Sequence, residues 1–235
     1  MLIVLDPGHG YGKAHNRGGV LFNEGDQNYK FAKVLKGELL KYENVTVKMT
    51  RNSIYENPTL SQRAKIGIGA DIFLSTHTNA FDSKVSGIEV WGGIKNSTKG
   101  KDLGARVSKS GSDILSIPNR GYKVRKNGTS DYWGVFRYGN TAKEKYLVEW
   151  CFHTNYSDSK KYLASQGKLA IMAAEEIAKK YGLTRKNYGI KTEAKATDVI
   201  HRIQVGAFGN YANAENYLKK LAEAGFNGII KTEKK

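Results

Sequence analysis

Cysteine and long apolar runs are nearly absent from this chain of 235 residues. The single cysteine, Cys151, has no second thiol to join, which excludes a scaffold held by internal disulfide bonds. The longest apolar runs, such as residues 2–5, fall far short of the ~20 residues that span a bilayer, so we expect no membrane insertion. No charged segment followed by a longer apolar one opens the sequence, so we also expect no signal peptide.

Acidic residues are scarce relative to basic ones, with 22 Asp and Glu against 38 Lys and Arg and a net charge of +16. This surplus predicts attraction to a polyanion, which is nucleic acid, an anionic membrane or the anionic polymers of a bacterial wall. The basic residues are spread along the chain without a dense block or a basic and aromatic motif, which argues against nucleic acid as a partner. A solvated basic surface explains the charge equally well.

Predicted strands and helices alternate over residues 1–183, which indicates an α/β fold with a twisted, largely parallel central sheet flanked by helices. Residues 117–135 are rich in Gly, Asn, Lys and aromatics without a clean period, so we expect a long functional or mobile loop there. Hydrophobic periodicity predicts strands at 2–5, 45–49, 71–77, 88–91 and 146–150, and helices at 27–42, 61–66, 103–115 and 162–181.

The composition changes after residue 183. Residues 184–199 are polar and poor in large apolar side chains, which is typical of a linker. Residues 200–235 predict a small β-α-β unit, with strands at 202–206 and 228–230 around a helix that includes residues 217–221. Such a unit is too small to bury much core alone, so we expect it to pack on the main domain or to pair with a second copy, as a monomer or a dimer.

Several polar side chains follow predicted strands, at the edge where open α/β sheets bind ligands. His9 follows the first strand, His77 and Glu149 stand at the ends of two later strands, and Glu24 lies in a loop before the first helix. Two imidazoles and a carboxylate form the ligand set of a catalytic zinc that keeps a fourth position open for water. A second carboxylate nearby would shuttle the proton of that water.

Each of these residues also has a structural explanation. A histidine in a glycine turn is often a capping or hydrogen-bonding residue, and Glu24 before a helix favours the helix dipole by about 0.3–1 kcal/mol. Glu149 is harder to explain in this way, because a carboxylate in an apolar strand is costly to bury without a partner. Residue spacing alone leaves both interpretations open.

A set of ordered motifs resembles those of the zinc-dependent N-acetylmuramoyl-L-alanine amidases of the amidase-3 type. The resemblance covers residues 1–183 and rests on residues 6–10 (DPGHG), Glu24 with Asn28, Arg51, Arg63, and residues 70–80, 87–90 and 147–155. It implies that His9, Glu24 and His77 bind zinc and that Glu149 is the catalytic carboxylate. The implied reaction is hydrolysis of the amide between the lactyl group of N-acetylmuramic acid and the L-alanine of the stem peptide, so bacterial peptidoglycan is the expected partner.

Further residues are expected around this centre. Asp6, Asn79 and Glu89 are interpreted as supports, with Asp6 or Glu89 accepting a ring N–H from a ligand histidine. Two interpretations of His153 stay open. It contacts the zinc ligands or the substrate, or it has a plain packing or surface role. Trp150 and His153 stand where the family usually has smaller or aliphatic residues, which affects the shape of the pocket more than zinc binding.

The C-terminal segment resembles a second family. Residues 202–214 are similar to the opening of a sporulation-related (SPOR) repeat, a wall-binding module that binds glycan strands lacking stem peptides. Such a module usually has two β-α-β halves and only one is present, so truncation and pairing of half-modules both stay open.

A rival interpretation from another class is a non-catalytic wall-binding or polyanion-binding protein with a degenerate amidase site. The intact set of His9, Glu24, His77 and Glu149 favours the enzyme. In the absence of a signal peptide, the resemblance implies a phage lysin held in the host cytoplasm or a mother-cell hydrolase of a sporulating bacterium. In both cases the protein acts on the cell wall after release.

Overall fold

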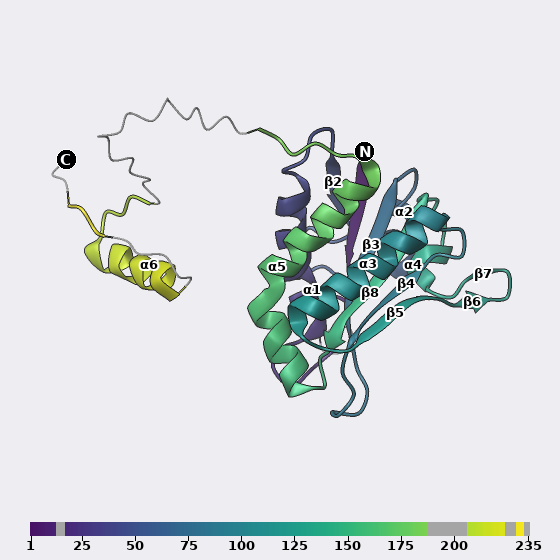
Figure 1. The fold of residues 1–235 in the computed structure, drawn as a ribbon, viewed down its shortest axis with the longest axis horizontal. Coiled ribbons are helices and arrows are strands. Elements are labelled where there is room, and N and C mark those ends of the chain that lie inside the picture. The colour runs from purple at the N-terminus through teal and green to yellow at the C-terminus, as the bar shows by residue number, and fades with distance from the viewer. Residues whose placement is uncertain (13–16, 188–205, 224–228, 233–235) are drawn as a thin grey trace. The chain divides into compact units, whose positions relative to one another are not determined.

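The computed structural model describes residues 1–12, 17–187, 206–223 and 229–232 (Figure 1). The chain divides into two compact units, residues 1–187 and residues 188–235. Backbone hydrogen bonds from Glu43 to Thr184 and from Lys186 to Lys41 keep the segment after residue 183 on the first unit. The two units are described separately below.

The first unit is built on a six-stranded sheet with the order β2-β1-β3-β8-β4-β5 (Figure 1). All neighbouring strands are parallel except β4 and β8, which are antiparallel. The predicted α/β fold with a largely parallel sheet is therefore confirmed. The strands are β1 (Leu2–Pro7), β2 (Thr46–Met49), β3 (Ile72–Asn79), β4 (Ile88–Gly92), β5 (Asn119–Val124) and β8 (Glu144–Phe152).

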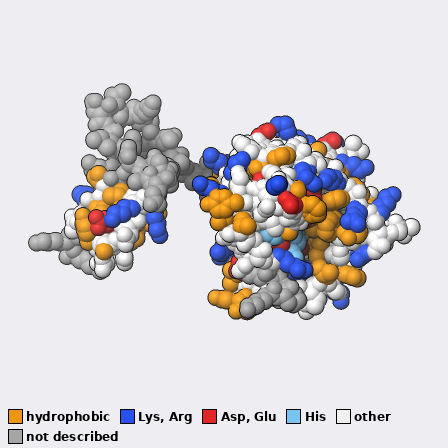
Figure 2. All heavy atoms as spheres, turned by 90° about the horizontal axis from the view of Figure 1, so that it is seen from below, with side chains coloured by type: hydrophobic (Ala, Val, Ile, Leu, Met, Phe, Trp, Pro, Cys, Tyr) orange, Lys and Arg blue, Asp and Glu red, His pale blue; other side chains and the backbone are white. Residues whose placement is uncertain are grey.

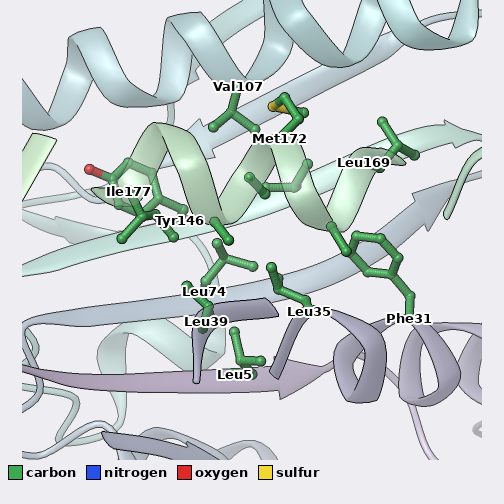
Figure 3. Close-up of a cluster of buried hydrophobic side chains, with 14 of the residues drawn as sticks. Leu5, Phe31, Leu35, Leu39, Leu74, Val107, Tyr146, Leu169, Met172 and Ile177 are labelled. Carbon is green, nitrogen blue, oxygen red and sulfur yellow. The ribbon is translucent and has the colours of Figure 1, made fainter. Parts of the chain in front are cut away.

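Three long helices cover one face of the sheet, namely α1 (Glu24–Leu39), α3 (Thr98–Leu115) and α5 (Tyr156–Tyr181). Their apolar side chains and those of the strands form the larger buried cluster, part of which Figure 3 shows around Leu5, Phe31 and Leu169. Among the described helices of the first unit, the opposite face carries only α2 (Leu60–Ile66) and α4 (Gly134–Arg137), with a smaller cluster around Phe73 and Phe136. We call these the long-helix face and the short-helix face.

Strand alternation decides which side chains meet each face, because successive residues point to opposite sides of a sheet. On β1, Ile3 and Leu5 join the cluster of the long-helix face, whereas Val4 joins that of the short-helix face. Asp6 follows the same alternation as Val4. The polar residues at the carboxyl ends of the strands therefore gather on the face that only short helices cover.

The segment 117–135 differs from the expected loop. It forms β5, a hairpin of β6 (Lys126–Asn127) and β7 (Ser130–Asp131), and the start of α4. β5 is an edge strand with no fully buried residue, so it lacks the apolar alternation that reveals an inner strand. The buried carboxylate of Asp131 ties the hairpin to the sheet by accepting hydrogen bonds from Lys145 Nζ (3.0 Å) and the backbone N–H of Ile94 (2.7 Å).

The second unit contains helix α6 (Tyr211–Glu223), in agreement with the predicted helix. The prediction of a strand at 228–230 is wrong for Ile229 and Ile230, which are not in a strand. Ile229 is 86% exposed, and no strand among the described residues pairs with it. Residues 202–205 of the other predicted strand and Gly228 lie outside the described residues. Among the helices described, none has the length and apolar character needed to cross a bilayer.

Candidate metal and catalytic site

The turn after β1 fixes the position of His9. Its backbone is left-handed, with φ of +59°, a conformation that costs about 1–3 kcal/mol for a residue other than glycine. Two buried guanidinium groups hold its carbonyl: Arg51 donates a hydrogen bond of 2.8 Å and Arg63 donates another. Gly8 permits the close approach of His77, because an added Cβ would lie 2.1 Å from His77 Nε2.

Asp6 supports this turn through Arg63, which donates hydrogen bonds to both Asp6 and the His9 carbonyl. Its carboxylate is fully buried and accepts hydrogen bonds from Arg63 (2.9 Å), Thr50 (2.5 Å) and Ser75 (2.6 Å). Burial alone would raise the pKa of Asp6, but the charge of Arg63 and these hydrogen bonds outweigh it and lower the pKa. The prediction that Asp6 accepts an imidazole N–H is wrong, because none of its described donors is an imidazole and the rings of His9 and His77 contact Glu24 instead.

His9, Glu24 and His77 converge from three separate elements. Glu24 begins α1, His77 lies at the carboxyl end of β3, and the imidazole rings are 5.1 Å apart between centroids. Glu24 Oε2 lies 3.1 Å from His9 Nε2, and Glu24 Oε1 lies 3.1 Å from His77 Nδ1. One potential ligand atom from each of the three residues lies within 4.8 Å of the others.

The electrostatics of this cluster suit a cation. Glu24 is only 2% exposed, and burial alone would raise its pKa. Hydrogen bonds from His77 and His9 outweigh burial and hold the pKa of Glu24 far below its usual range, so the carboxylate is ionised. Burial lowers the pKa of His77, but its hydrogen bond to Glu24 and the nearby acidic groups give a net rise.

Glu149 faces the same cavity. It is the register partner of His77 on the neighbouring strand β8, and both residues line a cavity of about 700 Å³ on the short-helix face. Figure 2 shows histidine side chains at the surface of the first unit beside hydrophobic side chains. Burial raises the pKa of Glu149 to about 8, and the charges of Glu24 and Glu89 add to the rise, while His77 opposes it. Among the described residues, Glu149 Oε2 has no hydrogen-bond partner.

His153 is buried at the end of β8 and also lines the cavity. Its Nδ1 lies 2.9 Å from Thr78 Oγ1, 3.0 Å from the Thr78 carbonyl and 3.9 Å from Glu24 Oε2. Burial lowers its pKa, which favours the neutral ring. Its backbone carbonyl accepts a hydrogen bond of 3.0 Å from Val20 and so ties down the loop that leads to Glu24. His153 is therefore a buried, packed residue that also lies beside the cluster of His9, Glu24 and His77.

Glu89 lies one strand further away and organises a different group. It is the register partner of Glu149 on β4. The prediction that Glu89 accepts an imidazole N–H is wrong, because the described donors to Glu89 are an amide, an indole, a guanidinium and an ammonium group, and none of them is an imidazole. Its oxygens accept hydrogen bonds from Asn79 (3.0 Å), Trp91 (3.1 Å), Arg120 (2.9 Å) and Lys123 (2.6 Å).

Sequence reasoning assigned no role to several residues that build the site. Arg51 and Arg63 were part of the recognised motifs, but arginine is usually a surface residue, and nothing in their local pattern predicts burial. Arg120, Lys123 and Trp133 belong to the segment expected to be a loop. Because β5 lacks an apolar alternation, no local signal indicated a role for Lys123.

Comparisons with known proteins agree with this geometry. A family model described as N-acetylmuramoyl-L-alanine amidase matches residues 3–181, and a model described as the SPOR domain matches residues 197–235. The chain is 26% identical over 234 residues to N-acetylmuramoyl-L-alanine amidase CwlM of Bacillus licheniformis, which covers 97% of this chain and 83% of that protein.

Two solved structures are similar to the first unit. The N-acetylmuramoyl-L-alanine amidase from Clostridium difficile 630 is 25% identical with a TM-score of 0.66, and the match covers 77% of this chain and 96% of that chain. Cwp6 from Clostridium difficile is 26% identical with a TM-score of 0.65 over 77% of this chain, and the match spans 28% of the Cwp6 chain.

Proposed function

The chain belongs to the family of N-acetylmuramoyl-L-alanine amidases and is a peptidoglycan amidase, and from this premise we propose that it works with a zinc ion held by His9, Glu24 and His77. The bond cleaved is the amide between the lactyl group of N-acetylmuramic acid and the L-alanine of the stem peptide. The proposal puts its action at the bacterial cell wall, as a lysin released from a host cytoplasm or as a mother-cell hydrolase.

One observation carries the zinc proposal: three ligand atoms of the types that zinc prefers lie within 4.8 Å of one another, and one of them belongs to a buried, ionised carboxylate. A buried anion beside two imidazoles is costly unless a cation or donors compensate it. Three protein ligands are also the number used by catalytic zinc sites, which leave the fourth position to water or substrate. When bound, zinc lowers the pKa of water towards ~7 and polarises carbonyl oxygens.

Glu149 is the proposed general base and general acid. Its carboxylate accepts a proton from the attacking water and then delivers that proton to the nitrogen of the leaving L-alanine. The raised pKa, about 8, brings this group closer to a neutral working pH than an ordinary glutamate, which favours transfer in both directions. Its buried Oε2 has no hydrogen-bond partner among the described residues, and an unsatisfied oxygen of this kind favours the protonated form that delivers a proton.

The remaining parts of the site hold these groups in place. Asp6 orients Arg63, Arg63 and Arg51 fix the carbonyl of His9, and Gly8 leaves room for His77. Glu24 Oε1 additionally accepts a hydrogen bond of 3.0 Å from the backbone N–H of Thr78, so its carboxylate is oriented before any cation binds.

We further propose a division of labour along the chain. Residues 1–183 form the catalytic domain, residues 184–199 a linker, and residues 200–235 a wall-binding module. The match of residues 197–235 to the SPOR domain supports the last assignment. The net charge of +16 favours attraction to anionic wall polymers in addition to peptidoglycan.

The test combines metal content with product analysis. The purified chain should contain zinc, lose hydrolysis of peptidoglycan in a chelator and regain it with added zinc, and mass spectrometry should find stem peptides that begin with a free L-alanine amine. Glu149→Gln should keep zinc and lose turnover, whereas Glu175→Gln, which changes an exposed carboxylate of α5, should behave as wild type. Hydrolysis that is insensitive to the chelator would contradict the proposal, and wall binding without any turnover would favour the non-catalytic alternative.

A further inference from the structure

A second, smaller hollow lies next to the catalytic cavity on the short-helix face. Its volume is about 320 Å³, and it shares Asn79 and Ala80 with the larger cavity. Its other lining residues are two aromatic rings, one aliphatic side chain and one cation, namely Phe81, Phe152, Val85 and Arg120. The lining is therefore apolar apart from Asn79 and a single guanidinium group.

Arg120 is held in a fixed orientation at the wall of this hollow. Its Nε donates a hydrogen bond of 2.9 Å to Glu89, and its guanidinium lies 5.1 Å from the centroid of the Phe152 ring. Within the described part of the chain, its two terminal nitrogen atoms donate no hydrogen bond. A guanidinium group presents its N–H donors as a planar fork that matches a carboxylate, so the unused donors of Arg120 form a ready anion-binding group.

The local charge balance also favours an anion. Glu89 is the only carboxylate bonded to both Arg120 and Lys123 among the described residues, so the three side chains carry one surplus positive charge. The Glu89 side chain is only 5% exposed, whereas the Arg120 and Lys123 side chains remain partly accessible to a ligand. The buried Phe152 ring lies against the guanidinium of Arg120 and shields one side of an ion pair formed there from water.

The hollow lies a short distance from the reacting group. Glu89 and Glu149 are register partners on neighbouring strands, which places their Cβ atoms about 4.5–5.5 Å apart. Asn79 connects the two hollows and donates a hydrogen bond to Glu89. On the sugar side of the cleaved amide the lactyl carboxyl group is itself the acyl group, so a carboxylate close to that bond belongs to the peptide.

We propose that this hollow is a subsite for a carboxylate on the peptide residue that follows L-alanine, and that Arg120 determines this specificity. The proposal rests on the proposed amidase function and adds a preference among its substrates. Glu89 acts as a positioning residue that orients Arg120 towards the hollow. An amide in place of the carboxylate removes the ion pair but keeps the size and shape of the substrate.

The experiment compares two synthetic muramoyl dipeptides that differ only in a free carboxylate or a carboxamide on the second residue. With the zinc-loaded full chain, kcat/KM should be about tenfold higher for the carboxylate substrate. Arg120→Gln should bring the ratio close to one by lowering the rate for the carboxylate alone. Arg120→Lys should retain part of the preference. Arg125→Gln, which changes an exposed cation stacked 3.7 Å from the Tyr132 ring, should retain all of it.

Two results would overturn the subsite: equal kcat/KM of the wild-type chain for both dipeptides, or an equal loss for both in Arg120→Gln. The second result would mean that Arg120 supports the fold near Glu89 instead of binding substrate. If the zinc-loaded wild-type chain hydrolyses neither dipeptide, the amidase proposal itself fails and the subsite fails with it. Failure of the subsite alone is therefore distinguishable from failure of the function.

Discussion

The two faces of the central sheet are built from the same strands but do different work. The long-helix face is closed by α1, α3 and α5 over a continuous apolar cluster. The short-helix face has only α2 and α4 as helical cover and carries Asp6, His77, Glu89 and Glu149. Because adjacent residues of one strand point to opposite faces, a residue that stabilises the core can be the direct neighbour of a residue that takes part in catalysis. Substitutions on the long-helix face should therefore change the free energy of unfolding, and substitutions on the short-helix face should change catalysis.

The sharpest test of this comparison uses two glutamates of β8. Glu149→Gln should lower kcat/KM about 10²–10⁴-fold with little loss of stability, because it removes the proton-transferring group. Glu144→Gln, at the other end of the strand, weakens a buried ion pair with Lys180 (3.0 Å) on the long-helix side. It should lower the free energy of unfolding and leave the turnover of folded protein near wild type. Steady-state kinetics and urea denaturation measure both variants.

A core substitution on the long-helix face should have the reverse effect. Phe31→Ala removes a fully buried ring that contacts Trp150 at 4.8 Å and Tyr162 at 5.9 Å between centroids. We expect a loss of about 3–5 kcal/mol in the free energy of unfolding. Zinc content and kcat of the remaining folded protein should be unchanged. A large drop in kcat at full folding would show that the two faces are coupled.

The pH dependence of the metal-free protein provides a third comparison. The folded pKa of Glu149, about 8, lies above the ordinary value of 4.5, so the folded state binds a proton that the unfolded chain has released. Its contribution to stability is complete below pH 4.5 and is lost as pH rises through 8. In a chelator, wild type should lose on the order of a few kcal/mol across this window relative to Glu149→Gln. Parallel melting curves of the two proteins would contradict this assignment.

A smaller effect is expected from Gly8→Ala. The new Cβ would lie 2.1 Å from His77 Nε2, so the ring must move away from Glu24. Overpacking of this kind costs about 1–3 kcal/mol, and displacement of the ring should weaken zinc binding by roughly tenfold or more. Gly37→Ala on α1, where the new Cβ meets no atom within 4 Å, is the matched control; it should leave zinc binding unchanged and raise stability slightly through the better helix propensity of alanine. Isothermal titration with zinc measures the difference.

Much of the fold followed from local patterns. The alternation of strand and helix predicted the layered architecture, and polar residues after apolar strands marked His9, His77 and Glu149. The segment 117–135 was misjudged because β5 is an exposed edge strand, whose residues need not alternate in hydrophobicity. The predicted partners of the histidines failed for a different reason: the donors that reach Asp6 and Glu89 come from neighbouring elements such as α2 and β5, and the periodicity of a single strand does not contain that placement.

The sequence by itself determined which elements form and which ligand chemistry stands at their ends, because periodicity and residue type are local properties. Only the tertiary structure decided which groups meet. Glu24 and His77 are 53 positions apart and share a 3.1 Å contact because α1 begins beside the carboxyl end of β3. Likewise, Glu89 holds Arg120 and Lys123 because the edge strand β5 pairs with β4 in the folded sheet.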